Sequence, residues 1–436
     1  MKKSTKKLMA LLLAILMLVA LTACSEQKTE TETPSSEQRA ETAGSGSAKP
    51  EEANAVPEKS YTIGVAEAQA IEDVTIRHEY YEKYLGPLYN VKFIFSERLE
   101  DDNATKAFIE NCIDMGADAI IDFKSCNSTM AKLCEENNLV YVINSVPRST
   151  NYDLYEGVSS AFAGGVAGNM PVTGSYIADW LTENSSEDGS EGFLISSCMA
   201  STGVVEHIEI TTRALEALQK KYGLTYTQEI GSIVMSPDPV IVENDKGINI
   251  YVYPGSPNRD TWLPGIVPLL TTGNYGFFIS CAETYDTTAN VVDEVERAKN
   301  IDIKVVSLGA MSSASLAFSN QDVHGNVSVD LVIATCSTAQ SGTLFAVTYN
   351  ALTNGVESQY IDGLPTYYTV NKLRLAGLGE AETLKGWDTM QTKNWIADQE
   401  FIDQLLIIKN PDLDPAGMKE FLASIDYDAI VEMISR

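Results

Sequence analysis

The sequence predicts an α/β protein of two doubly wound lobes, each a parallel sheet covered by helices, followed by a C-terminal helical extension. The chain has 436 residues, enough for two or three domains. Its hydrophobic content of 44% and charged content of 21% are typical of a globular protein. From residue 61 onward, short apolar runs alternate with segments of helical periodicity, and the alternation restarts near residue 166. Strands separated by such helices form βαβ units and hence parallel sheets.

The first 23 residues predict a lipoprotein signal peptide. Four lysines precede an uncharged stretch at residues 8–21, which has the length of a signal h-region rather than of a transmembrane helix. The stretch ends in Leu-Thr-Ala-Cys, which resembles a bacterial lipobox, so we expect Cys24 to be lipidated. The alternative is an ordinary signal peptide whose cleavage site happens to precede a cysteine.

Residues 24–60 predict a disordered tether. After Cys24 the segment contains no Leu, Ile, Phe, Tyr or Trp, and it is rich in Glu, Thr, Ser, Ala and Pro. Such a composition cannot bury enough apolar surface to offset the entropy of ordering.

The first lobe begins at residue 61 with a short apolar run that reads as a buried strand. Asp101 or Asp102 can cap one of the following helices, and Gly116 can end it. We expect strands at residues 61–65, 91–95, 119–123 and 139–143, and helices at residues 72–89, 102–116 and 128–138.

In the second half, Pro171 should lie in the first turn of a helix or at a kink. Residues 225–247 should form an irregular or β insertion. We expect helices at residues 166–182, 203–221, 259–271, 286–299 and 338–353, with strands at 193–196, 248–253, 277–281, 303–308, 327–332 and 367–373. In the extension, we expect helices at residues 398–407 and 415–425.

Several functions are disfavoured by the composition. The net charge is −29, and it becomes −33 once the signal segment with its four lysines is removed, so nucleic acid is an improbable partner. The three histidines are scattered and there is no Cys-x-x-Cys, so we expect no metal site and no cofactor. Cys112 and Cys134 fall on apolar helix faces, which favours buried thiols.

The order of elements resembles the type I periplasmic binding proteins, the ribose-binding-like group of substrate-binding lipoproteins of ABC importers. Residues 61–65 are similar to the opening strand of that family, residues 116–121 to its third strand and residues 140–145 to its fourth. Residues 158–165 resemble its "V-x-x-D-N-x-x-G-G" motif, with Ala161 and Phe162 in place of Asp-Asn. The resemblance covers about residues 61–375.

This resemblance implies two lobes joined by a three-strand hinge. By the family's chain path, residues 61–159 and 310–355 form the N-terminal lobe. Residues 160–309 and 356–376 form the C-terminal lobe, and residues 377–436 the helical extension. Ligands of open α/β sheets bind outside the carboxyl ends of the strands, so a shared cleft is expected there.

Polar side chains that follow strands are the candidates for this cleft. Arginine suits ligand oxygens because its guanidinium is a planar fork of donors. Ser201 could be only a helix cap, Arg148 could be a surface partner of Asp153, and a Trp on a helix is more often core than a stacking platform. The candidate ligand-binding residues are Glu67, Asn144, Arg148, Ser201, Arg259, Trp262 and Glu283.

The resemblance implies a lipid-anchored solute-binding protein on the extracytoplasmic face of the cell membrane. It would be a monomer, without catalytic activity, that captures a small polar ligand for the permease subunits of an ABC transporter. Carbohydrate-like compounds are among the candidate ligands, although the polar residues typical of sugar-binding members are largely replaced. The alternatives are a lipoprotein that presents its ligand to a membrane receptor and, less favoured, an extracellular enzyme on the same scaffold.

Overall fold

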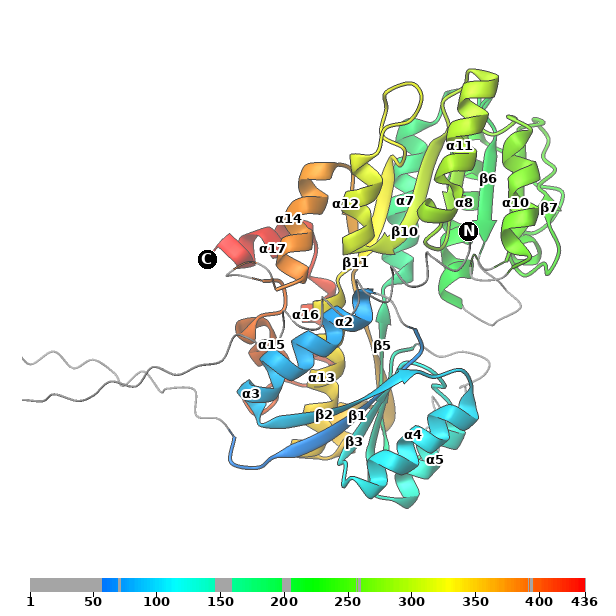
Figure 1. Cartoon of the computed structure of the whole chain (residues 1–436). Coiled ribbons are helices and arrows are strands. Elements are labelled where there is room, and N and C mark those ends of the chain that lie inside the picture. Colours follow the sequence, from blue (N-terminus) through cyan, green and yellow to red (C-terminus); the bar gives the residue numbers. More distant parts are fainter. Residues whose placement is uncertain are drawn as a thin grey trace, which may run out of the picture. The chain divides into compact units, whose positions relative to one another are not determined.

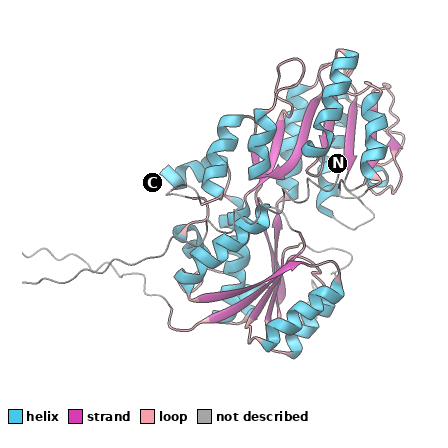
Figure 2. Cartoon of the chain, in the orientation of Figure 1, coloured by secondary structure: helices cyan, strands magenta, loops and turns pink. Residues whose placement is uncertain are grey.

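The computed structural model describes residues 57–436, except 70–71, 146–158, 198–204, 256, 258–259, 391, 393–394 and 436. Helices and strands alternate along this part of the chain, and they build two seven-stranded sheets (Figures 1 and 2). Among the described helices, none combines the length and apolarity that a bilayer-spanning helix requires. The predicted signal peptide and most of the predicted tether lie outside the described residues.

The first sheet has the strand order β12-β13-β5-β4-β3-β1-β2, and every neighbouring pair is parallel except β12 with β13. Its strands are β1 (Tyr61–Glu67), β2 (Val91–Arg98), β3 (Ala119–Asp122), β4 (Val140–Ile143), β5 (Phe162–Gly168), β12 (Tyr360–Ile361) and β13 (Leu364–Val370).

Helices cover both faces of the first sheet. On one face, α4 (Asp102–Asp114) and α5 (Ser128–Glu136) bury Cys112 and Cys134 against Tyr141 and Phe162. The other face carries α2 (Glu72–Glu79), the π-helical turn η2 (Tyr80–Leu85), α3 (Gly86–Tyr89) and α13 (Ser337–Asn354). The expected helix at 72–89 is therefore present, and the two cysteines are the buried thiols that the sequence indicated.

The second sheet has the order β14-β11-β10-β9-β6-β8-β7, with antiparallel edge strands β7 and β14. Its strands are β6 (Phe193–Ser197), β7 (Val240–Ile241), β8 (Ile250–Pro254), β9 (Phe277–Ser280), β10 (Lys304–Ala310), β11 (Leu331–Thr335) and β14 (Leu373–Leu375). Helices α7 (Met170–Asn184) and α8 (Val205–Tyr222) cover one face, and α10 (Trp262–Thr271), α11 (Tyr285–Lys299) and α12 (Met311–Ser319) cover the other. The insertion holds the short helix α9 (Ile230–Val234) and β7, and Pro171 lies in the first turn of α7.

The chain crosses between the sheets three times, but not at the expected positions. It leaves the first sheet after β5, returns after β11 and leaves again after β13. Residues 162–168 and 364–370 therefore belong to the first sheet, whereas residues 311–335 belong with the second. The sheets therefore divide the chain at other positions than the expected boundaries at 159, 310 and 356. The first boundary differs because β5 was not predicted as a strand, and the other two because the strands expected at 327–332 and 367–373 were each assigned to the other lobe.

The sequence of β5 does not look like that of a strand, because the backbones of its neighbours pack so closely that glycine is required there. A Cβ atom on Gly164 would lie 2.1 Å from the Thr366 carbonyl oxygen, and the φ angle of Gly164 is 136°. A Cβ atom on Gly165 would lie 2.5 Å from the Ser145 carbonyl oxygen. These small residues lower the apparent strand propensity, although β5 is buried between β4 and β13.

The C-terminal extension contributes to the cores of the fold. Its described residues form four helices, α14 (Leu378–Asp388), α15 (Gln399–Leu405), α16 (Pro415–Ala423) and α17 (Tyr427–Ser435). Of these, α15 and α16 were predicted. Helix α14 packs on α12, α15 on α13, and α16 on β13. Two buried side chains, one tyrosine and one asparagine, donate hydrogen bonds to the extension. The Tyr80 hydroxyl donates to the Ala397 carbonyl at 2.6 Å, and the Asn350 side-chain amide donates to the Leu405 carbonyl at 2.8 Å.

Candidate functional site

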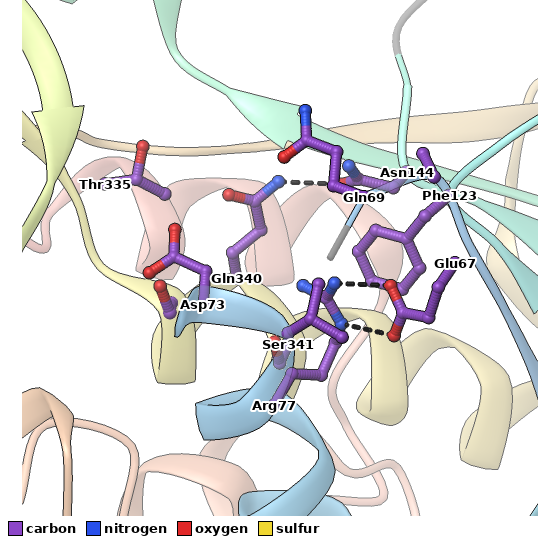
Figure 3. Close-up of a pocket in the computed structure, with 12 residues that line it drawn as sticks. Glu67, Gln69, Asp73, Arg77, Phe123, Asn144, Thr335, Gln340 and Ser341 are labelled. Carbon is purple, nitrogen blue, oxygen red and sulfur yellow. Dashed lines mark hydrogen bonds and ion pairs between the residues drawn. The ribbon is translucent and has the colours of Figure 1, made fainter. Parts of the chain in front are cut away.

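A small pocket lies at the carboxyl ends of β1, β3, β4 and β11, next to α2 and the first turns of α13 (Figure 3). Its volume is about 180 Å³, which suits a compact molecule. Figure 3 shows Asp73 and Thr335 on one side and Glu67 and Phe123 on the other. The lining residues are Glu67, Ala68, Gln69, Asp73, Val74, Arg77, Phe123, Asn144, Thr335, Ser337, Gln340 and Ser341.

An ion-paired group forms one wall of the pocket. Arg77 binds the carboxylate of Glu67 with both prongs of its guanidinium, at 3.0 Å and 2.6 Å, and lies 3.8 Å above the ring of Phe123. His78 contacts the same carboxylate at 3.1 Å. Burial alone would raise the pKa of Glu67, but the hydrogen bonds from His78 and Arg77 outweigh it, so that its pKa is lowered. Glu67 is thus an ionised carboxylate held in place by its partners.

The opposite wall contains polar atoms that make no regular hydrogen bond. The Asp73 Oδ1 atom and the Ser337 hydroxyl are buried, and neither makes a hydrogen bond of regular geometry among the described residues, although Ser337 lies close enough to Asp73 to lower the pKa of its carboxyl. Burial, together with the charge of nearby Asp388, raises the pKa of Asp73 to about 6. Buried polar groups are normally paired, so these two atoms mark a place where a bound molecule can supply the missing hydrogen bonds.

The first turn of α13 is fixed from the C-terminal extension. Asp388, at the end of α14, accepts hydrogen bonds from the Ser337 and Thr338 amides at 2.9 Å and 2.8 Å, and from the Thr338 hydroxyl at 2.5 Å. Amides at the start of a helix have no intrahelical acceptor, so the carboxylate satisfies them. This contact positions Ser337 and Gln340 at the pocket.

The floor of the pocket contains an amide pair. The Gln340 side chain on α13 donates to the Asn144 side-chain oxygen after β4 at 2.6 Å. Because that bond uses the Asn144 oxygen, the Asn144 amide nitrogen and the Gln340 oxygen remain to bind a ligand. The pocket therefore offers both donors and acceptors.

Of the four predicted ligand-binding residues that the structure describes, Glu67 and Asn144 line this pocket together. Trp262 is a correction: its ring is 2% exposed and its Nε1 donates to the Ser196 hydroxyl at 3.2 Å, so it is a core residue and no stacking surface. Glu283 is exposed after β9 and is not among the described residues that line this pocket. Arg148, Ser201, Arg259 and the predicted lipidation site Cys24 lie outside the described residues.

The residues that sequence reasoning missed lie on helices or far along the chain. Asp73 and Arg77 are four residues apart on α2, which places both on one face of that helix. Their four-residue spacing, on the helix that follows the first strand, could have indicated that both side chains face the pocket. Ser337 and Gln340 follow β11, and the misplacement of that strand in the other lobe concealed them.

No family model and no curated protein sequence matches the chain. Solved structures do match. The periplasmic ribose ABC transporter protein of Conexibacter woesei superposes with a TM-score of 0.53 at 13% identity, over 76% of this chain and 98% of its own. An ABC transporter solute-binding protein of Actinobacillus succinogenes, solved with D-allose, gives 0.51 at 14% identity, over 74% and 99%. One from Bacillus halodurans, solved with myo-inositol, gives 0.50 at 15% identity, over 76% and 99%.

Each of these neighbours is covered almost completely, and the match takes in about three quarters of this chain. It confirms the fold class that the sequence predicted. The chain has the two-lobed α/β fold of the type I periplasmic binding proteins.

Proposed function

We propose that the protein is a solute-binding protein that captures a small, hydroxyl- or amide-rich molecule for an ABC transporter. The observation that carries the proposal is the pocket at the carboxyl ends of the strands, where two buried polar atoms make no regular hydrogen bond to the described part of the chain. Three structural neighbours come from ABC transporters, and two of them hold a sugar or a cyclic polyol, which supports a ligand of this class.

The chemistry of the pocket favours a ligand that is uncharged or zwitterionic. The guanidinium of Arg77 is bound to Glu67, so it is not available as a free anion site. Asp73 and the Gln340 side-chain oxygen are acceptors, which suit the hydroxyl or amide donors of a ligand. A polyanion would also have to approach a chain of strong negative charge.

We infer that the second side of the site comes from residues of the other lobe. Arg259, Ser201 and Glu283 follow strands of the second sheet and would contact the ligand when the lobes close, whereas Arg148 would act from the first lobe. In this mechanism the ligand bridges both lobes and shifts the population toward a closed state.

The proposal includes an extracytoplasmic location, attachment through a lipid on Cys24, action as a monomer and the absence of catalysis. The sequence of the leader supports the anchor. A receptor-presenting role uses the same pocket, and only the membrane partner separates it from import. Co-purification with permease subunits supports import, whereas co-purification with a receptor supports the sensory role.

Native mass spectrometry of the purified protein should identify a co-purified small molecule, and calorimetry should then measure its affinity. Asn144→Ala and Gln340→Ala should each weaken binding by about tenfold or more, because each leaves a polar group of the closed site unpaired. Asn137→Ala is the matched control, since that exposed side chain donates only to the nearby Leu133 carbonyl. Unchanged affinity in both pocket variants contradicts this site, and chemical turnover of the ligand contradicts a pure binding role.

A further inference from the structure

Three carboxylates converge at the end of the second sheet opposite Thr335. Glu296 lies in the last turns of α11, Asp302 precedes β10, and Asp322 lies in the connection between α12 and β11. That connection is the loop above α12 in Figure 1. One oxygen from each residue lies within 4.8 Å of the others. Three separate segments of the chain thus direct negative charge to one point.

Glu296 is the buried member of this group. The residue is 1% exposed, and its Oε1 atom accepts a hydrogen bond from the Ile303 amide at 2.8 Å. Its Oε2 atom is buried and has no hydrogen-bond partner among the described residues. Leaving a buried carboxylate oxygen without a partner is unfavourable, so this atom itself indicates a missing ligand.

Further charges of both signs surround the three carboxylates. Asp293 and Asp330 add two more acids nearby, and the Asp293 Oδ1 atom is also buried without a partner among the described residues. The cations Arg297 and Lys304 lie close enough to act on these two outer acids. None of the ion pairs formed within the described chain involves any of these five carboxylates. The three converging carboxylates therefore have no ion-pair partner among the described residues.

Local hydrogen bonds hold the loop in a shape that brings the carboxylates together. The Asp322 Oδ1 atom accepts from the His324 and Asn326 amides at 2.7 Å and 2.9 Å. The Asn326 side chain donates to Asp302 Oδ1 at 3.1 Å, which ties the two loops to each other. Each of these two aspartates uses only its Oδ1 atom in these bonds.

We propose that Glu296, Asp302 and Asp322 bind a Ca²⁺ ion. Ca²⁺ takes oxygen ligands at about 2.3–2.6 Å, so two of its ligands can be about 5 Å apart, which accommodates the spacing of these oxygens. Ca²⁺ also accepts several carboxylates in an irregular arrangement, whereas Mg²⁺ demands a near-ideal octahedron and retains most of its water. Water would complete the coordination, because Asp302 is exposed.

The site is separate from the proposed ligand pocket. It lies before β10 and β11, at their amino ends, whereas Thr335 at the carboxyl end of β11 lines the pocket. Bound Ca²⁺ would therefore join α11 to the loops that precede β10 and β11, and it would stabilise the second lobe without contacting the solute.

The test is thermal unfolding and calorimetry of the purified full chain, with CaCl₂ as the probe, after treatment with a chelator. CaCl₂ should raise the melting temperature and saturate with a dissociation constant of about 10⁻⁴–10⁻³ M or tighter, the range of extracellular calcium modules. The same concentration of MgCl₂ should have a smaller effect. The proposal would be overturned if neither the melting temperature nor the binding heat changed at CaCl₂ concentrations about 10-fold above that range of dissociation constants.

Glu296→Gln and Asp322→Asn should each weaken Ca²⁺ binding at least tenfold. Glu294→Gln, an exposed acid on the same helix, is the matched control and should bind as the unmodified protein does. Because Glu296→Gln removes a buried charge, we expect it to fold without Ca²⁺. If Glu296→Gln, Asp322→Asn and the control Glu294→Gln all bound Ca²⁺ equally well, the binding would come from the acidic surface in general, and this site would be rejected. A shift with MgCl₂ as large as that with CaCl₂ would reject the choice of ion.

Discussion

Asp73 illustrates how a residue that lines the pocket can reduce the stability of the fold. Its raised pKa of about 6 means that ionisation is less favourable in the folded chain than in the unfolded chain. As the pH rises from about 4 to above 6, the unfolded state loses its proton first, so the free energy of unfolding decreases. At neutral pH, the folded protein therefore carries a partly buried charge.

We predict that Asp73→Asn stabilises the protein at pH 7.5 by about 1–3 kcal/mol. The gain should nearly vanish at about pH 3, below the unfolded value of 3.8, where Asp73 is mostly protonated in both states. Urea unfolding at both pH values measures this difference, and the same variant should bind the solute more weakly. A loss of stability at pH 7.5 would show that Asp73 already has a charged partner.

Unlike Asp73, Arg77 and Glu67 stabilise the fold as a buried ion pair. Removing one partner would leave the other as a buried charge without its counter-ion. Glu67 is 1% exposed, and Arg77→Ala would leave its carboxylate with His78 alone. We expect a loss of about 3–5 kcal/mol in the free energy of unfolding. Arg213→Ala is the control, because its pairs with Glu209 and Glu216 are exposed and should contribute under about 1 kcal/mol.

The stabilisation from the Arg77–Glu67 pair should depend on pH. The pKa of Glu67 is lowered in the folded state, so the stabilising effect is fully present above the unfolded value near 4.5. It should decline as the pH falls through the folded-state pKa. Equal losses in Arg77→Ala and Arg213→Ala at neutral pH would contradict the buried role of the pair.

Sequence position identified the parts of the site that immediately follow strands. Glu67 and Asn144 were predicted because each lies at the end of an apolar run, and both line the pocket. Trp262 follows a strand in the same way but is turned into the core, where Ser196 satisfies its ring nitrogen. Position alone cannot distinguish these outcomes, because side-chain direction is set by tertiary contacts.

At the scale of elements, β5 shows why a buried strand can lack a strand-like sequence. We predict that Gly164→Ala destabilises the protein by about 2 kcal/mol or more, because the new Cβ meets the Thr366 carbonyl and φ is positive. Gly379→Ala, in helix α14 with no atom within 4 Å, should be neutral or stabilising by up to about 1 kcal/mol. Similar effects of the two changes on the melting temperature would argue against the close approach of β5 and β13.

Strands with alternating or continuous apolar runs, such as β1, β6 and β9, were predicted within one or two residues. The expected strand at residues 327–332 begins instead at Leu331. The Ser328 amide donates to the Asn320 carbonyl, next to the bridge between Gln321 and Val327, and the Asp330 carboxylate accepts from the Val305 amide of β10. Helix α12 was missed because its small residues carry little periodicity.

For the whole molecule, attachment to the membrane is the prediction that rests on sequence alone. Cys24→Ser should shift the protein from the membrane fraction to the soluble fraction or to an uncleaved precursor, because the two acyl chains of a diacylglyceryl group are needed for stable anchoring. Ser35→Ala, in the tether, should partition as the unmodified protein does. Membrane partitioning and processing that persist in Cys24→Ser would reject lipidation at this residue.

The pairing of β5 with β13 has a consequence for the kinetics of folding. Gly164 lies beside Thr366, so completion of the first sheet must close a loop of about two hundred residues. The intervening segment has to form most of the second lobe before this closure is efficient, and α15 then packs on α13 from still further along the chain. We therefore expect slow, multiphase refolding in which the second lobe acquires structure first. Under the export that we propose from the leader sequence, such a delay would keep the chain unfolded while it is threaded through a secretion channel.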